Sequence, residues 1–166
     1  MNNVKLDLGY SKAVIDHFQH PRNIGKIEHP DGIGRITNPV CGDVTELYVR
    51  IKGGVVEEAT FQSLGCAVTI ASASVFTEKI KGCDIVKLIS GKDEEVVSRL
   101  VGLIESELGE LPAKKLHCPP ATVQAFLEAM QQYNEEEGNL GVAARVKALV
   151  PLVAEYYKRG AKKDGE

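Results

Sequence analysis

Three of the four cysteines in this sequence lie where one predicted element of secondary structure ends and the next begins. Cys41 lies in a loop between a proline and a glycine, and Asp43 follows it by two positions. Cys66 separates a predicted strand from a predicted helix, and Cys118 is followed directly by Pro119. Because a buried structural cysteine prefers apolar neighbours, the surroundings of Cys41 indicate a thiol that is presented for chemistry.

Two of these cysteines, Cys66 and Cys118, fall at predicted helix N-termini, since proline favours the first position of a helix. The positive end of a helix dipole lowers the pKa of a thiol, and the thiolate is both the nucleophile and the ligand that soft metals prefer. Asp43 and His117 add an oxygen donor and a nitrogen donor beside them. Three thiolates with an aspartate or a histidine predict a tetrahedral site for zinc or for an iron–sulfur cluster.

The spacing of these residues predicts how such a site would be assembled. Cys66 follows Cys41 by 25 positions, and Cys118 follows Cys66 by 52. Zinc fingers take their ligands from close local pairs, and the sequence contains no Cys-x-x-Cys pair. We therefore expect the fold to bring sulfur atoms from three distant segments into one shallow pocket at the edge of the molecule.

The fourth cysteine and the other three histidines are assigned structural or solvent-exposed roles. Cys83 lacks the neighbours that mark the first three cysteines, and we assign it a packing or surface role. His17 and His20 belong to a predicted first helix and its end, and His29 lies in a predicted loop. We expect these three histidines to be solvated or to cap the helix.

Alternation of apolar and polar residues predicts a β-hairpin preceded by an edge strand, with the three strands at 32–37, 44–51 and 55–62. On the hairpin we expect one face to point into the core: Leu47, Val49 and Ile51 from its first strand, and Val55, Ala59 and Phe61 from its second.

Helical spacing of apolar residues predicts helices at 10–19, 67–82, 85–90, 92–109, 119–134 and 140–158. Pro151 lies inside the last of these and should kink or split it. Strands followed by helices predict the α+β class, with a small three-stranded antiparallel sheet and helices packed on one face. We divide the chain into a main domain, residues 1–138, and an additional C-terminal helix and tail, residues 139–166, which either packs on that domain or forms an interface.

Composition excludes several classes of function. The chain has 166 residues, 43% of them hydrophobic, and a net charge of −3, as expected for one globular domain. It has no basic face and no tryptophan, so we expect no nucleic-acid binding. No apolar run approaches the roughly 18 residues of a membrane span, and the N-terminus lacks the apolar core of a signal peptide. We expect a cytoplasmic protein with reduced thiols.

Three stretches, NPVCGDV, SLGCAVTIASAS and LPAKKLHC, occur in an order that resembles the iron–sulfur cluster assembly scaffold family of IscU and the N-terminal domain of NifU. The stretch YSKAVIDHFQHPRNIG resembles the opening helix of that family, and the resemblance extends from about Tyr10 to Tyr133. It implies a non-enzymatic scaffold that accepts sulfur from a cysteine desulfurase, binds iron, holds a transient [2Fe–2S] cluster and passes it to apo-proteins.

The resemblance also implies roles for single residues. Cys41, Cys66 and Cys118 match the cluster cysteines of the family, and Cys118 and Cys41 are the candidate sulfur acceptors. Asp43 matches an aspartate associated with keeping the cluster labile, and His117 matches a candidate fourth ligand. A carboxylate suits iron beside sulfide less well than a fourth thiolate, and such a site should hold its cluster less permanently.

Two departures from the family pattern bear on partners. The stretch recognised by an Hsp70-type chaperone commonly reads Leu-Pro-Pro-Val-Lys, whereas residues 111–115 read Leu-Pro-Ala-Lys-Lys, which weakens the prediction of that partner. A related branch of the family is a zinc-dependent sulfurtransferase partner of the desulfurase, and this remains the alternative function. That branch usually lacks the histidine before the last cysteine, so His117 favours the scaffold.

Overall fold

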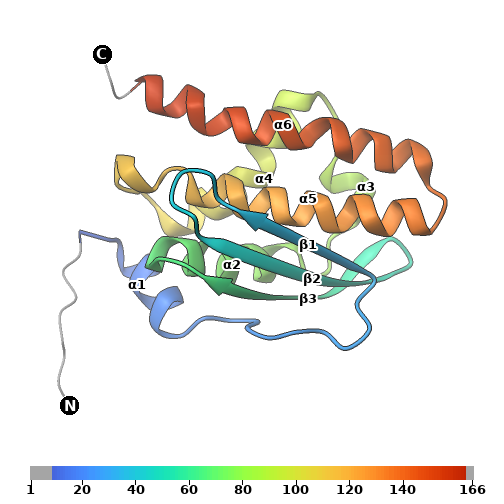
Figure 1. Cartoon of the computed structure of the whole chain (residues 1–166), viewed down its shortest axis with the longest axis horizontal. Coiled ribbons are helices and arrows are strands. Elements are labelled where there is room, and N and C mark those ends of the chain that lie inside the picture. Colours follow the sequence, from blue (N-terminus) through green and yellow to red (C-terminus); the bar gives the residue numbers. More distant parts are fainter. Residues whose placement is uncertain (1–8, 164–166) are drawn as a thin grey trace.

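Three antiparallel strands form a sheet in the order β1 (Gly32–Thr37), β2 (Val44–Lys52) and β3 (Val55–Leu64). The computed structural model describes residues 9–163 and places the helices on one face of this sheet (Figure 1). The α+β class, the three strands and the position of β1 at an edge are therefore as the sequence predicts.

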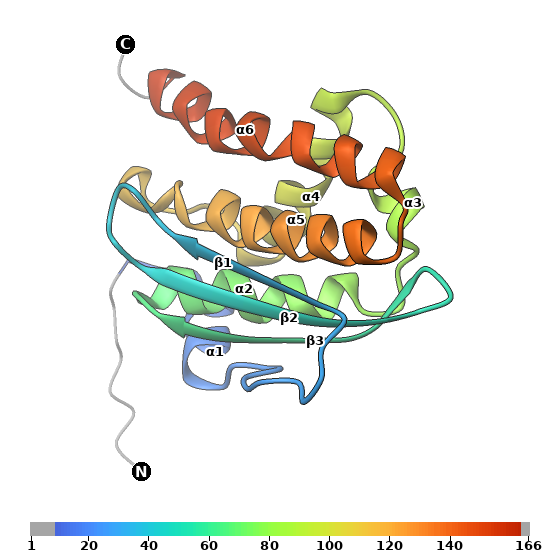
Figure 2. The same cartoon turned by 45° about the vertical axis from the view of Figure 1, so that its right-hand side comes forward.

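Each predicted helix is present, with ends that differ from the prediction by a few residues. The helices are α1 (Lys12–Gln19), α2 (Ala67–Ile80), α3 (Ile85–Leu88), α4 (Asp93–Leu108), α5 (Cys118–Glu136) and α6 (Leu140–Lys163), with a 3₁₀ turn η1 (Ala113–Lys115) before α5. Helices α2 and α5 lie against the sheet, α4 packs behind them, and α6 is the outermost layer (Figure 2). No helix among the described residues is long and apolar enough to cross a membrane.

Two glycines allow the edge strand β1 to lie directly against α5. A Cβ atom at Gly34 would come within 1.6 Å of the carbonyl oxygen of Ala125. A Cβ atom at Gly32 would come within 2.4 Å of the carbonyl oxygen of Ala129, one helical turn further on. Side chains of α5 also cover the free edge of β1, since Glu128 accepts a hydrogen bond from the backbone N–H of Arg35. These contacts hold the start of α5 close to the loop that follows β1.

A β-bulge changes which residues of the hairpin face the core. The pairing of β2 with β3 shifts between Arg50 and Ile51, so that Ile51 lies opposite Val56. Val56 is fully buried and Val55 is partly exposed, and the prediction that Val55 faces the core is therefore wrong. Simple alternation cannot anticipate the extra residue of a bulge. The other predicted core positions of the hairpin are buried: Leu47, Val49, Ile51, Ala59 and Phe61.

The first helix buries a histidine that the sequence places in solvent. His17 is only 5% exposed, and its Nδ1 lies 2.8 Å from the hydroxyl oxygen of Ser74 on α2. The prediction of a solvated or capping His17 is wrong because α1 packs on α2 with this side chain between them. His20 follows the last residue of α1 and is exposed, and His29 is exposed in a loop, as predicted.

Helix α6 runs antiparallel to α5 and packs along it (Figure 2). Pro151 lies inside α6 and does not split it, and its side chain is exposed. Near the N-terminus of α6, Arg145 forms an ion pair with Asp93 and donates a hydrogen bond to the carbonyl oxygen of Gly91 at 2.6 Å. The face of α6 toward α5 is apolar and buried: Ala143, Val146, Leu149 and Val153.

The predicted domain boundary falls at the turn between α5 and α6, where Gly138 adopts a positive φ of 77°. The division into residues 1–138 and 139–166 stays a prediction, and residues 1–8 and 164–166 lie outside the described residues. Since the apolar face of α6 is buried against α5, we expect the two parts to unfold together.

Replacing Leu149 by Ala should therefore destabilise the whole protein and not α6 alone. The side chain is fully buried, and its truncation is expected to lower the free energy of unfolding by about 2–5 kcal/mol. Urea unfolding followed by circular dichroism should show one transition at a lower midpoint. The exposed neighbour substitution Lys147→Ala serves as the control and should change the free energy by less than about 0.5 kcal/mol. An unchanged midpoint for Leu149→Ala, or a separate early transition, would show that α6 is not part of the cooperative unit.

Candidate functional site

The loop that carries Cys41 is closed by hydrogen bonds from Asn38. The backbone N–H of Asn38 donates to the carbonyl oxygen of Asp43 at 2.7 Å, and the N–H of Gly42 donates to the carbonyl oxygen of Asn38 at 2.8 Å. Gly42 has a φ of 76°, a conformation that favours glycine. The buried amide of Asn38 donates to the carbonyl oxygen of His117 at 3.3 Å and so ties this loop to the start of α5. Asn38 is not among the residues predicted from the sequence, although an Asn-Pro pair marks a turn.

Cys66 and Cys118 begin two different helices, as predicted, and their sulfur atoms meet. Cys66 is the N-cap residue of α2, and Cys118 is the first residue of α5. The two Sγ atoms are 3.9 Å apart. With metal–sulfur bonds of about 2.3 Å, two sulfur ligands of a tetrahedral ion lie about 3.8 Å apart. The pair is therefore spaced like two corners of a tetrahedral site.

Asp43 is bound to the start of α2. Its Oδ2 accepts the backbone N–H of Cys66 at 3.0 Å and the hydroxyl of Thr69 at 2.7 Å. Gly65 makes room for this carboxylate, because a Cβ atom there would lie 2.8 Å from Oδ2. Asp43 is predicted from the sequence, whereas Thr69 and Gly65 are not, because they lie on a segment distant in sequence from it. No sequence pattern signals a contact between these residues and Asp43.

The structure brings the other predicted ligands to the same end of the molecule without completing a metal site. Cys41 is exposed and interacts with the Asp43 side chain, while His117 is buried directly before Cys118. Across residues 9–163, no group of three His, Cys, Asp or Glu side chains is close enough together to hold a metal ion. The set of Cys41, Asp43, Cys66, His117 and Cys118 as metal ligands therefore stays a prediction.

The two neighbouring thiols differ in acidity. A hydrogen bond from the Cys118 thiol lowers the pKa of Cys66 to about 5, and the hydroxyl and backbone N–H of Thr69 and the charge of Lys115 act in the same direction. The same hydrogen bond, together with complete burial, raises the pKa of Cys118. At neutral pH the pair is therefore one thiolate, Cys66, held by one thiol, Cys118.

The charges of the other predicted ligands follow from their surroundings. Partial burial opposes ionisation of Asp43, but hydrogen bonds from Thr69 and from the Cys66 backbone outweigh it and lower the pKa of Asp43. Burial lowers the pKa of His117, which leaves its imidazole neutral at pH 7 and able to bind a metal. Partial desolvation of the sulfur and the charge of Asp43 raise the pKa of Cys41. At pH 7 Asp43 is therefore an anionic oxygen donor and His117 a neutral nitrogen donor, whereas the Cys41 thiol must lose its proton before its sulfur can bind a metal.

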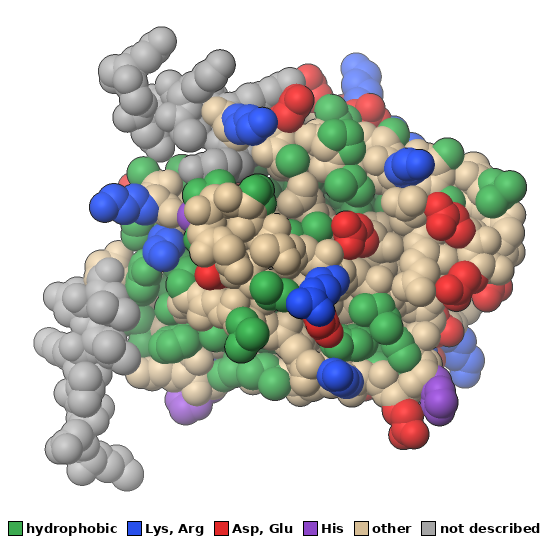
Figure 3. Space-filling view, viewed as in Figure 1, with side chains coloured by type: hydrophobic (Ala, Val, Ile, Leu, Met, Phe, Trp, Pro, Cys, Tyr) green, Lys and Arg blue, Asp and Glu red, His purple; other side chains and the backbone are tan. Residues whose placement is uncertain are grey.

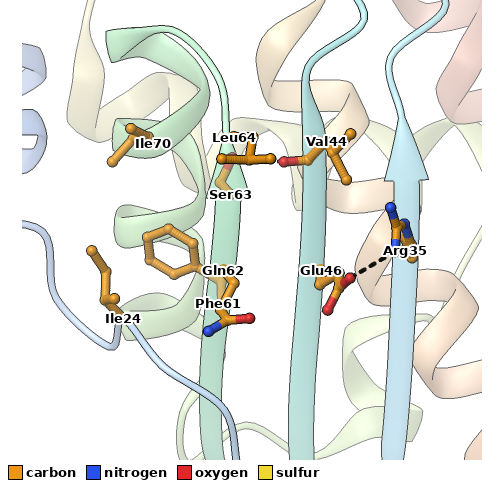
Figure 4. Close-up of a pocket in the computed structure, with 9 residues that line it drawn as sticks. All are labelled: Ile24, Arg35, Val44, Glu46, Phe61, Gln62, Ser63, Leu64 and Ile70. Atoms are coloured by element: carbon orange, nitrogen blue, oxygen red, sulfur yellow. Dashed lines mark hydrogen bonds and ion pairs between the residues drawn. The ribbon is translucent and has the colours of Figure 1, made fainter.

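Two hollows flank this group of residues. One, of about 460 Å³, lies on the outer face of the sheet beside the strand end that leads to Cys66, and Figure 4 shows Ile24, Phe61 and Leu64 lining it near an Arg35–Glu46 ion pair. Figure 3 shows hydrophobic side chains between scattered charges on this face. The other hollow, of about 250 Å³, is lined by residues 36–40, His117, three further residues of α5 and Ala154 of α6.

Comparisons of the sequence link it to known proteins. The profile of the family described as NifU-like N terminal domain matches residues 9–139. The chain is 40% identical over 131 residues to the iron-sulfur cluster assembly scaffold protein IscU 1 of Archaeoglobus fulgidus, which covers 79% of this chain and 80% of that protein. It is 33% identical over 135 residues to the scaffold protein IscU of Haemophilus influenzae, which covers 79% of this chain and 100% of that protein. Helix α6 lies outside the matched profile.

The fold is also similar to that of solved structures. The N-terminal part of a NifU-like protein from Brucella abortus superposes with a TM-score of 0.60 at 19% identity, covering 76% of this chain and 94% of the other. A putative scaffold protein of the SUF system from Fervidobacterium islandicum gives a TM-score of 0.51 at 23% identity, covering 71% and 96%. At these identities the likeness concerns the fold alone.

The unequal acidity of the thiols can be tested by alkylation of the metal-free protein with iodoacetamide. The rate at Cys66 should reach a plateau above about pH 6, because the thiolate is already formed, and should fall as the pH is lowered through 5. The rate at Cys41 should still rise at pH 9 because its pKa is raised. Peptide-resolved mass spectrometry measures both rates in one sample.

Protein unfolded in guanidinium provides the control for this experiment, since the thiols of Cys66 and Cys41 should then both have a pKa of about 8.5. A Cys66 profile with its midpoint above pH 8 in the folded protein would contradict the proposed thiolate.

Proposed function

The chain belongs to the NifU-like N-terminal domain family, and from this premise we propose that it is a scaffold on which an iron–sulfur cluster is assembled and then passed to other proteins. The observation that carries the proposal is the 3.9 Å contact between Cys66 and Cys118, with the Asp43 carboxylate bound beside it. Two sulfur donors from distant segments are in contact before any cargo binds, and the Asp43 carboxylate is held at the start of the helix that carries one of them.

The cluster is the cargo of this scaffold, and we propose that it is a transient [2Fe–2S] cluster. Cys41, Cys66 and Cys118 supply three thiolates, and Asp43 or His117 supplies the fourth ligand. Cys41 lies on an exposed loop and reaches the cargo from the solvent side. A site with one oxygen or nitrogen ligand and one exposed thiolate holds its cluster less firmly than four buried thiolates, which suits a protein that must release it.

Sulfur reaches the site from a cysteine desulfurase in this proposal. A thiolate of the scaffold attacks the outer sulfur of the donor persulfide, which forms a new persulfide on the scaffold and releases the donor thiolate. Both predicted acceptors have a raised pKa, but Cys41 is exposed, whereas Cys118 is fully buried. We therefore favour Cys41 as the first acceptor. Reduction of its persulfide to sulfide needs two electrons from an external reductant.

Anaerobic reconstitution tests the proposal. The reduced protein, incubated with Fe²⁺, cysteine and a cysteine desulfurase, should develop the visible absorption of sulfide-to-iron charge transfer. Cys66→Ser should lose most of this absorption, since it removes one sulfur of the preformed pair and leaves Cys118 without its partner. Cys83→Ser is the matched control, because this thiol donates to the Lys79 carbonyl oxygen away from the site. A wild-type protein that stays colourless would contradict the scaffold function.

A zinc-dependent sulfurtransferase remains the second candidate, because the Cys66–Cys118 spacing suits zinc as well as iron. This function predicts tightly held zinc and faster desulfurase turnover with sulfur on Cys41, and no cluster in the reconstitution. Acceleration of the desulfurase without visible absorption would favour it over the scaffold.

The partners follow from the proposed function. We propose a cysteine desulfurase as donor and apo iron–sulfur proteins as acceptors, with the cytoplasm as the compartment. In the stretch 111–115, Lys114 is exposed and lies in η1 beside the site. It adds a positive charge where the family pattern has valine, so an Hsp70-type chaperone would meet a changed surface here.

A further inference from the structure

Thr69 lies in the first turn of α2 with its side chain directed at the predicted ligands. The residue is 3% exposed, and its hydroxyl is 2.7 Å from Asp43 Oδ2 and 3.4 Å from Cys66 Sγ. We propose that Thr69 is a positioning residue that holds the Asp43 carboxylate beside Cys66 and Cys118 for metal binding. This inference rests on the proposed function and adds to it a residue outside the predicted ligand set.

The hydrogen bonds determine which oxygen of Asp43 can face a metal. Both the Cys66 backbone N–H and the Thr69 hydroxyl donate to Oδ2. Two donors occupy the lone pairs of one carboxylate oxygen, so Oδ1 is the oxygen left to coordinate. Thr69 therefore favours coordination through a single oxygen and fixes the direction from which that oxygen approaches the cysteines.

Gly65 provides independent support for this arrangement. A Cβ atom at Gly65 would lie 2.8 Å from Asp43 Oδ2 and 2.9 Å from Thr69 Cγ2. The carboxylate and the threonine are thus packed together against a backbone that has no side chain at this point. The position of Asp43 is therefore defined by close packing against the Gly65 backbone as well as by its hydrogen bonds.

The Thr69 hydroxyl also connects Asp43 to Cys66. It has one proton and lies within hydrogen-bonding distance of both the Asp43 carboxylate and the Cys66 sulfur. Removing the hydroxyl should affect both groups, whereas removing only the methyl group should affect neither. This difference separates a positioning role from simple packing of a buried side chain.

Groups that orient metal ligands typically account for 10–100-fold in metal affinity. We expect Thr69→Val, which keeps the shape and removes the hydroxyl, to weaken Zn²⁺ binding by at least about 10-fold. Thr69→Ser keeps the hydroxyl, and its Zn²⁺ affinity should stay within about 3-fold of that of the wild type. Asp43→Ala should weaken binding as well, and adding Thr69→Val to it should cause a smaller further loss than Thr69→Val causes in the wild type.

Affinities are measured on the reduced full-length protein by competition with a chromophoric zinc chelator. Thr77→Val is the matched control, because Thr77 is a fully buried threonine of the same helix whose hydroxyl donates to backbone carbonyl oxygens of α2 away from the site. Its zinc affinity should equal that of the wild type, and circular dichroism checks that every variant is folded. Thr69→Val with wild-type affinity, or with an equal additional loss in the Asp43→Ala background, would overturn the proposal.

A measurement without metal keeps this inference separable from the scaffold function. In the metal-free protein, the amide proton of Cys66 donates to Asp43, and its NMR shift reports that bond. Thr69→Val and Asp43→Ala should move this resonance in the same direction, while Thr69→Ser should leave it in place. If only Asp43→Ala moves it, Asp43 stays in position without Thr69 and the inference is wrong, whether or not the protein assembles a cluster.

Discussion

The hydrogen bond between the Asp43 carboxylate and the Cys66 backbone N–H is the contact on which the rest of the site depends. It joins the loop after β1 to the start of α2, two segments that are distant in the chain. The N-terminus of a helix favours a negative charge, and here the charge comes from a side chain of another element because the N-cap residue is a cysteine. Because the Asp43 carboxylate accepts the N–H group at the start of α2, the Cys66 sulfur remains available to contact Cys118.

The second constraint is electrostatic. Two thiolates 3.9 Å apart in a partly buried setting repel each other, so one of them keeps its proton. The more exposed Cys66 ionises, and the buried Cys118 stays a thiol that donates to it. A cation that binds between them must displace the Cys118 proton, so metal binding releases a proton and strengthens as the pH rises.

The helices hold this arrangement from behind. Glycines at 32 and 34 let β1 approach α5, and Asn38 ties the Cys41 loop to the residue before Cys118. Helix α6 packs on the side of α5 that faces away from the sheet. Its residue Ala154 lines the same hollow as His117. Helix α6 lies beyond the residues that the family profile matches.

Local signals in the chain predict the α+β class, the three strands, the six helices and the helix-terminal positions of Cys66 and Cys118. Periodicity, proline and glycine are local signals, and they suffice for features that depend on neighbours in the chain. The structure alone decided that Val56 replaces Val55 in the core, that His17 is buried, and that Thr69 and Gly65 enclose the Asp43 carboxylate. A bulge depends on the partner strand, and burial and hydrogen bonding depend on elements that meet only after folding. No local pattern encodes those contacts.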